Sequence, residues 1–180
     1  MDSPCGGGGQ GATYLEWCAI RWIKELLGYD TPDSHGLFVS GGSMANLTAL
    51  AAARHAAAER AGWDMRRDGM RGAPDFKIYT SSETHACVTK SMELMGMGNS
   101  AIRLIRTDSN YRIDINELKN LIEKDIKDGS VPFCVVGSAG TVNTGAVDDL
   151  DALADLCQHN GIWFHVDGAY GAFGALDPER

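Results

Sequence analysis

The sequence predicts an α/β fold with a mainly parallel sheet and helices on both of its faces. Short apolar runs alternate with helical segments along most of the chain, and each run is almost continuously apolar. A strand that is buried on both faces has no polar side, so such runs indicate a parallel sheet covered by helices. With 180 residues, of which 44% are hydrophobic, the chain is long enough to bury one core of ordinary domain size.

The N-terminal part is expected to hold a connecting segment and then a helix. Residues 1–12 are expected to be flexible because Gly6–Gly9 is a low-complexity run. Thr13 is the expected N-cap of a helix whose apolar residues recur at helical spacing as far as Leu26. Gly28 is expected to end that helix.

The first strand–loop–helix unit is expected at residues 37–60. Residues 37–39 form a short apolar run that Gly36 precedes and Gly41 and Gly42 follow, so they are expected to be a strand. Residues 43–60 are rich in alanine and leucine, which predicts a helix.

The same alternation continues to the end of the chain. Further strands are expected at residues 77–80, 102–105, 133–137 and 162–166, and further helices at residues 84–95, 115–127 and 149–159. A box-like pair, Asp114 and Glu117, is expected to begin one helix, and Gly161 is expected to end another. Residues 63–75, with glycine and proline breakers, are expected to be a long polar loop.

Composition excludes several classes of partner. The 24 acidic and 16 basic residues give a formal net charge of -8, which would repel nucleic acid. No apolar run approaches the roughly 20 residues that span a bilayer, and the N-terminus lacks the layout of a signal peptide, so a cytoplasmic protein without a membrane partner is expected. The 5 cysteines are widely spaced and form no Cys-x-x-Cys pair, so reduced thiols are expected and no metal site is predicted.

Polar and small residues follow the predicted strands directly. They occupy four segments: residues 40–46, 81–85, 138–145 and 167–170. In open α/β sheets ligands bind beyond the carboxyl ends of the strands. These four segments therefore predict a ligand site at one edge of the sheet.

The first segment is a candidate phosphate cradle. Gly41, Gly42 and Ser43 come just before or at the start of a helix, where backbone N–H groups and the positive helix end favour an anion. The pattern is neither the Walker motif nor the dinucleotide-binding glycine motif, which argues against an NTP or NAD site. The alternative is that these residues form only a tight turn before the helix, with the serine as the helix cap.

Two further residues are candidates for ligand contact. Asp167 ends an apolar strand, where a carboxylate needs a cationic or hydrogen-bonding partner, such as a pyridinium nitrogen. Capping of the turn at Gly168 and metal binding together with His165 are alternatives, although no third ligand has a recognisable spacing. His85 could stack its flat ring on an aromatic ligand, or be a structural or solvated histidine.

Three motifs together carry a resemblance to a known family. They are residues 38–47 (FVSGGSMANL), 139–146 (AGTVNTGA) and 163–171 (WFHVDGAYG). In order and spacing they resemble the group II decarboxylases that depend on pyridoxal 5'-phosphate (PLP), such as the aromatic-L-amino-acid decarboxylases. The likeness covers nearly the whole chain and implies part of the large domain of a PLP-transferase of fold type I.

The resemblance implies a PLP site with two catalytic residues, His85 and Asp167. Ser43 and the backbone around Met44 would hold the phosphate, while His85 and Ala169 would contact the two faces of the ring. Asp167 would pair with the pyridine nitrogen and keep it protonated, so that the ring accepts the electrons released with carbon dioxide. The implied cofactor contacts are Gly42, Ser43, Met44, His85, Thr141, Asp167 and Ala169.

Two implied positions fit the family less closely. Thr141 and Asp148 match positions near the cofactor only loosely. Val142 stands where some animal members of the family have a hydroxyl residue.

The resemblance also implies that the family's C-terminal small domain, the segment with its Schiff-base lysine, its mobile catalytic loop and most of its N-terminal segment are absent. The family's Schiff-base lysine follows the aspartate motif, yet Lys127 is the last lysine of this chain. We therefore expect an inactive fragment of a homodimeric carboxy-lyase that acts on an amino acid, whose side chain stays open with a preference for aromatic ones. Another fold-type-I enzyme (an aldehyde synthase, an aldolase-type lyase or an aminotransferase) and a non-catalytic split subunit or remnant are the alternatives.

Overall fold

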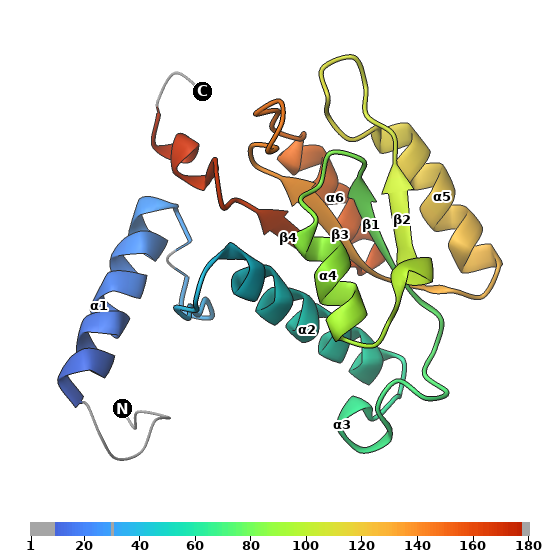
Figure 1. The fold of residues 1–180 in the computed structure, drawn as a ribbon, viewed down its shortest axis with the longest axis horizontal. Helices are drawn as coiled ribbons and strands as arrows, with labels where there is room; N and C mark the ends of the chain where they lie inside the picture. The colour runs from blue at the N-terminus through green and yellow to red at the C-terminus, as the bar shows by residue number, and fades with distance from the viewer. Residues whose placement is uncertain (1–9, 30, 178–180) are drawn as a thin grey trace.

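A four-stranded parallel sheet lies between two layers of helices (Figure 1). The computed structural model describes residues 10–29 and 31–177. The strand order is β2-β1-β3-β4, which confirms the predicted fold class. In chain order the elements are α1 (Gln10–Leu26), α2 (Gly42–Arg60), α3 (Met65–Asp68), β1 (Phe76–Ser81), α4 (Cys87–Leu94), η1 (Asn99–Ala101), β2 (Ile102–Ile105), α5 (Ile115–Lys127), β3 (Val131–Ser138), α6 (Leu150–Asn160), β4 (Trp163–Asp167) and η2 (Ala172–Leu176).

Successive side chains of the central strands enter two separate cores. Ile78 of β1 and Val136 of β3 pack with α2 and α4 on one face of the sheet. Tyr79 and Val135, the neighbouring residues, pack with α5 and α6 on the other face. Since side chains alternate along a strand, a strand with two buried faces must be apolar on both, as the sequence of β3 is.

Several predicted boundaries are confirmed. β2 and α5 have the predicted bounds, and α6 ends at Gly161, whose φ of 63° is left-handed. Asp114 caps α5, accepting hydrogen bonds from the backbone N–H groups of Asn116 and Glu117. Glu117 does not complete the box, because its carboxylate accepts hydrogen bonds from Arg106.

The N-terminal helix begins earlier than predicted. α1 starts at Gln10, so residues 10–12 are helical and Thr13 lies inside the helix rather than at its N-cap. Gln10 and Ala12 have high helix propensity, which allows the extra turn. Gly28 follows the helix with a φ of 68°, as predicted. The glycine run 6–9 lies outside the described residues.

The predicted strand at residues 37–39 is wrong. These residues have no regular structure, and the backbone N–H of Phe38 donates to Glu16 Oε1 of α1 at 3.2 Å instead of to a neighbouring strand. Gly36 approaches Ile20 of the same helix closely. A run of three apolar residues becomes a strand only when another strand pairs with it, and the described sheet offers none at this place.

The predicted polar loop at residues 63–75 is partly wrong. It contains the short helix α3, capped by Asp64, and Met65 is buried. Trp63 packs against the core on the α2 side, and its indole N–H donates to the carbonyl of Gly69 at 2.8 Å. A few apolar residues are therefore enough to hold this segment against the core.

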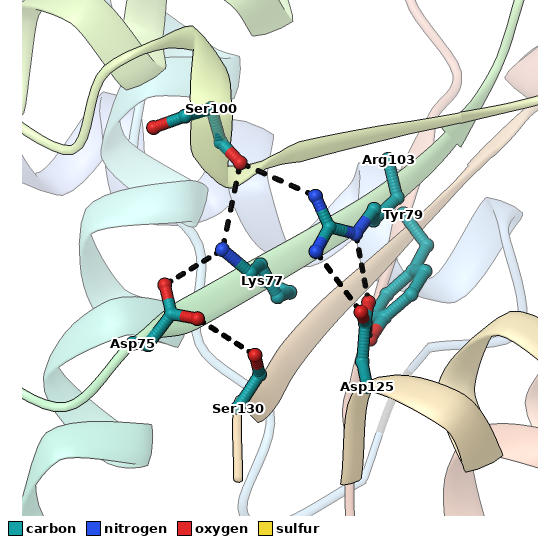
Figure 2. A network of polar contacts seen from close by, with 7 residues as sticks. All are labelled: Asp75, Lys77, Tyr79, Ser100, Arg103, Asp125 and Ser130. Atoms are coloured by element: carbon teal, nitrogen blue, oxygen red, sulfur yellow. Dashed lines mark hydrogen bonds and ion pairs between the residues drawn. The ribbon is translucent and has the colours of Figure 1, made fainter. Parts of the chain in front are cut away.

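A polar network ties the amino-terminal part of the sheet to α5 (Figure 2). Asp125 of α5 is only 3% exposed and forms a two-point ion pair with Arg103 of β2, with Nε–Oδ2 at 2.8 Å and Nη2–Oδ1 at 2.9 Å. The hydroxyl of Tyr79 donates to the same carboxylate at 2.9 Å. Burial raises the pKa of Asp125, but the bonds from Arg103 and Tyr79 outweigh it, so the pKa lies below its usual value.

The second half of the network surrounds a buried lysine. Lys77 Nζ lies 2.6 Å from Asp75 Oδ1, and Ser130 donates to the other oxygen of Asp75 at 2.7 Å. Lys77 and Arg103 both donate to the carbonyl of Ser100, which joins the two halves. Each charge in this network has partners, so we assign it a structural role.

Within residues 10–29 and 31–177, the helices are too short or too polar to span a lipid bilayer.

Removing the carboxylate of Asp125 should destabilise the fold. We expect Asp125→Ala to lower the free energy of unfolding at pH 7 by about 2–3 kcal/mol, below the roughly 3–5 kcal/mol of a fully buried pair, because Arg103 keeps contact with water. Urea titration followed by circular dichroism measures this.

The loss of unfolding free energy caused by Asp125→Ala should depend on pH. The folded pKa of Asp125 is lowered, so its stabilisation is present above the unfolded pKa of about 3.9 and is lost as pH falls through the folded pKa. Asp155→Ala, on the exposed side of α6, is the control and should change stability by less than about 0.5 kcal/mol. An equal cost of Asp125→Ala at pH 7 and pH 3 would contradict the assigned role.

Candidate functional site

An open cavity of about 340 Å³ lies at the carboxyl edge of the sheet. All four predicted segments line it, among them Ser43, His85, Thr141 and Asp167. From β1 the chain passes to β2 on one side, while β3 and β4 lie on the other. The connections therefore diverge between β1 and β3, which is where open α/β sheets bind ligands.

Six of the seven predicted cofactor contacts line this cavity: Gly42, Ser43, His85, Thr141, Asp167 and Ala169. Met44 does not line it. The Met44 side chain is 42% exposed, and its backbone N–H donates to the carbonyl of Gly41 at 3.1 Å. The start of α2 therefore reaches the cavity through Gly42 and Ser43.

The N-terminus of α2 has no capping side chain. Gly41 is the N-cap residue, with a φ of 90° that favours glycine, and no acidic residue stands in the first turn. Ser43 lies inside the helix, so the structure does not support the alternative of a serine cap. An uncapped helix start with free N–H groups and a positive dipole is suited to an anion.

Asp167 stands at the end of β4 and lines the cavity without a cationic partner in the described part of the chain. Its Oδ1 accepts a long hydrogen bond of 3.3 Å from the backbone N–H of Ala169. Its Oδ2 lies 4.0 Å from Cys87 Sγ. The turn at Ala169 thus occupies one acceptor position of the Asp167 carboxylate. Its other acceptor positions can accept hydrogen bonds from a ligand.

His85 is held in one orientation by the turn before α4. Its Nδ1 accepts a hydrogen bond of 3.1 Å from the backbone N–H of Cys87, so the neutral ring carries its proton on Nε2. Residues 82–86 form this turn, and α4 therefore begins at Cys87 rather than at the predicted residue 84. Burial, and then the charge of Asp167, raise the pKa of the Cys87 thiol, which keeps it protonated.

The loop after β3 forms the third wall. Thr141 is buried, and its hydroxyl pairs with that of Thr144 at 2.6 Å. Gly140 has a φ of 91°, and a Cβ there would lie 2.8 Å from the ring of Tyr170. Val142 lines the cavity with a 69% exposed side chain and offers no hydrogen bond there.

Several further residues line the cavity. They were not among the seven predicted cofactor contacts, but Asn46, Glu83, Ser138, Gly140, Val142 and Tyr170 lie within the four predicted segments. Cys87 lies outside those segments. Asn46 stands one helical turn after Gly42, and this spacing could have indicated it. Its Oδ1 lies 2.7 Å from Nε2 of His165, the residue considered as a metal ligand. The described residues contain no group of three side chains placed to hold a metal ion.

Asp148 does not line the cavity, although the resemblance placed it loosely near the cofactor. Its carboxylate is 3% exposed and accepts hydrogen bonds from the backbone N–H groups of Ile113, at 2.7 Å, and Ser138, at 2.8 Å. Burial raises its pKa, and these two bonds oppose the shift. Asp148 therefore does not contact the cavity itself. Its hydrogen bonds hold the end of β3, where the cavity begins.

Comparison with known proteins finds similarity over most of the chain. Residues 11–178 match the model of the pyridoxal-dependent decarboxylase conserved domain. The chain is 44% identical to an aromatic-L-amino-acid decarboxylase of Bacillus atrophaeus, over 91% of this chain and 32% of that protein. It is 36% identical to the cysteine sulfinic acid decarboxylase of Mus musculus, over 87% of this chain and 31% of that protein.

A solved structure extends the likeness to three dimensions. The glutamate decarboxylase domain of a diaminobutyrate-pyruvate transaminase and L-2,4-diaminobutyrate decarboxylase from Vibrio parahaemolyticus superposes with a TM-score of 0.88 at 34% identity. The match covers 93% of this chain and 37% of that one. The chain spans about a third of the length of the curated relatives it matches.

Replacing Asp148 should disturb the end of β3. In Asp148→Asn a single oxygen must serve two backbone donors, and the new amide N–H₂ faces one of them. We expect the free energy of unfolding to fall by about 1–3 kcal/mol, measured by urea titration. The adjacent Asp149→Asn is the matched control, because Asp149 is the N-cap of α6 and asparagine caps equally well. Equal effects of the two substitutions would contradict the role of Asp148.

Proposed function

Since the chain belongs to the pyridoxal-dependent decarboxylase family, we propose that it forms the PLP-binding part of an amino-acid decarboxylase, a carboxy-lyase. One observation carries the proposal: the uncapped start of α2 and the carboxylate of Asp167 line the same cavity. The first suits a phosphate and the second a protonated pyridine nitrogen, which are the two polar ends of PLP.

The residues present fit this cofactor. Gly42 and Ser43 would hold the phosphate at the helix start, and the hydroxyl of Ser43 adds a donor. His85 and Ala169 also line the cavity and would contact the ring. Asp167 would keep the ring nitrogen protonated, because a nearby carboxylate favours the charged form. Bound PLP supplies an electron sink, which accepts the electrons of the bond that breaks when carbon dioxide is released.

The covalent lysine of the cofactor site would come from outside this chain. No lysine among the described residues lines the cavity. Lys90, on α4, is exposed. We therefore propose that the active protein is longer than these 180 residues and that the chain alone is inactive.

The proposed substrate is an amino acid with an aromatic side chain. The support is the 44% identity to an aromatic-L-amino-acid decarboxylase, against 36% to a cysteine sulfinic acid decarboxylase. The proposed site binds the cofactor and not the side chain of the substrate. The higher sequence identity to the aromatic-L-amino-acid decarboxylase is therefore the argument for an aromatic substrate.

We further propose a homodimer in the cytoplasm. α1 exposes a series of large apolar side chains that a partner subunit would cover: Tyr14, Leu15, Trp17, Trp22 and Leu26. Cys18, Cys87, Cys134 and Cys157 are free thiols, as expected in a reducing compartment.

Loss of the charge on Asp167 should weaken cofactor binding. In the full-length protein that carries this chain, we expect Asp167→Asn to weaken PLP binding by roughly 10- to 100-fold, because a hydrogen bond to a charged group contributes about 1.5–3 kcal/mol. Equilibrium dialysis and the absorbance of bound PLP measure the loss. Asp155→Asn removes an exposed charge from α6 and should leave affinity unchanged. Unchanged affinity in Asp167→Asn would contradict the site.

Product analysis of the same protein tests the reaction. A decarboxylase releases one carbon dioxide and one amine for each amino acid consumed. An aldehyde or a keto acid as product would favour another fold-type-I enzyme. PLP binding without turnover of any amino acid would favour a non-catalytic subunit.

The apolar face of α1 should contribute to dimer formation. We expect Trp22→Glu to shift the full-length protein from dimer toward monomer in light scattering coupled to gel filtration, because a buried charge disfavours association. Leu94→Glu, at a 75% exposed position of α4, is the matched control and should leave the mass unchanged. A monomeric wild-type protein would rule out the proposed homodimer.

A further inference from the structure

Asn46 connects the start of α2 with β4 through two hydrogen bonds. The residue is only 4% exposed and lines the cavity. Its Nδ2 donates to the carbonyl of Gly42 at 3.0 Å, and its Oδ1 lies 2.7 Å from His165 Nε2. These partners stand on two elements that are far apart in the sequence.

The chemistry of the groups sets the direction of both bonds. A backbone carbonyl only accepts hydrogen bonds, so the amide nitrogen must face Gly42 and the amide oxygen must face His165. Oδ1 of Asn46 also only accepts, so Nε2 of His165 carries a proton. Burial lowers the pKa of His165, although the charge of Asp167 opposes this shift. The lowered pKa favours the neutral ring.

The pair links the two elements that carry the proposed anchor points of the cofactor. Gly42 belongs to the helix start that suits the phosphate. His165 and Asp167 are two residues apart on β4 and point to the same face of the sheet. A continuous series of contacts therefore runs from the helix start through Asn46 and His165 to the strand that ends at Asp167.

We propose that Asn46 and His165 form a positioning pair that sets the separation between the anion-binding start of α2 and Asp167. The inference rests on the proposed PLP site. A cofactor with two polar ends gains from both only when its two binding groups already stand at the right separation, since a site held in the bound geometry loses less freedom on binding. Neither residue is assigned a chemical step.

A role in positioning differs from a role in stability alone. If the pair only stabilises the fold, its loss weakens the binding of every ligand in the cavity by a similar factor. If it sets the separation, its loss weakens PLP, which uses both ends, more than pyridoxal, which lacks the phosphate. The ratio of the two affinities therefore separates the two roles.

The experiment compares PLP and pyridoxal on the full-length protein that carries this chain, by equilibrium dialysis. We expect Asn46→Leu to weaken PLP binding by about tenfold or more and pyridoxal binding by less than about threefold. His165→Leu should reproduce this result. His165→Gln keeps an N–H donor and should retain a ratio within about threefold of the wild type.

Asn160→Leu is the matched control. Asn160 donates to the carbonyl of Leu156, four residues earlier, at 2.8 Å, as Asn46 does to Gly42, but it lies at the end of α6 outside the cavity. It should leave the ratio unchanged.

The outcomes separate this inference from the proposed function. A wild-type protein that binds neither ligand overturns both. A wild-type protein that prefers PLP, with the same ratio in Asn46→Leu, overturns the positioning pair and leaves the proposed function standing. Should Asn46→Leu fail to fold, equal ratios in His165→Leu and His165→Gln overturn the pair.

Discussion

The parallel pairing of β1 with β3 at the centre of the sheet is the constraint on which the rest of the structure depends. Parallel strands bring all carboxyl ends to one edge, so segments that are far apart in the sequence meet there. The chain leaves β1 toward β2 and later adds β3 and β4 on the opposite side. This divergence opens the cavity, and helices on both faces bury the strands that support it (Figure 1).

The charged groups at the two ends of the sheet differ in whether they have partners. Toward the amino end, Lys77, Arg103 and Asp125 are paired with neighbours, and the buried groups hold β1, β2 and α5 together (Figure 2). At the carboxyl end, Asp167 has no ion-pair partner in the described part of the chain, and α2 begins without a capping side chain. Paired charges stabilise the fold, whereas groups with spare hydrogen-bonding capacity at a cavity can bind a ligand.

The predictions from sequence succeeded where local rules decide the structure. β2, α5 and α6 follow from apolar periodicity and from capping at Asp114 and Gly161. They failed where a distant partner decides. Residues 37–39 lack a neighbouring strand, so the predicted strand does not form. Periodicity carries no information on such partners.

The sequence by itself determined the fold class, the family resemblance and the four segments at the ligand edge, because each follows from short runs and motifs and from their order along the chain. Only the tertiary structure decided which side chains of those segments share the cavity. Asn46 and His165 are 119 positions apart, and their hydrogen bond exists because α2 packs beside β4. The buried amide needs partners that no local pattern specifies, and only the packing of the two elements supplies them.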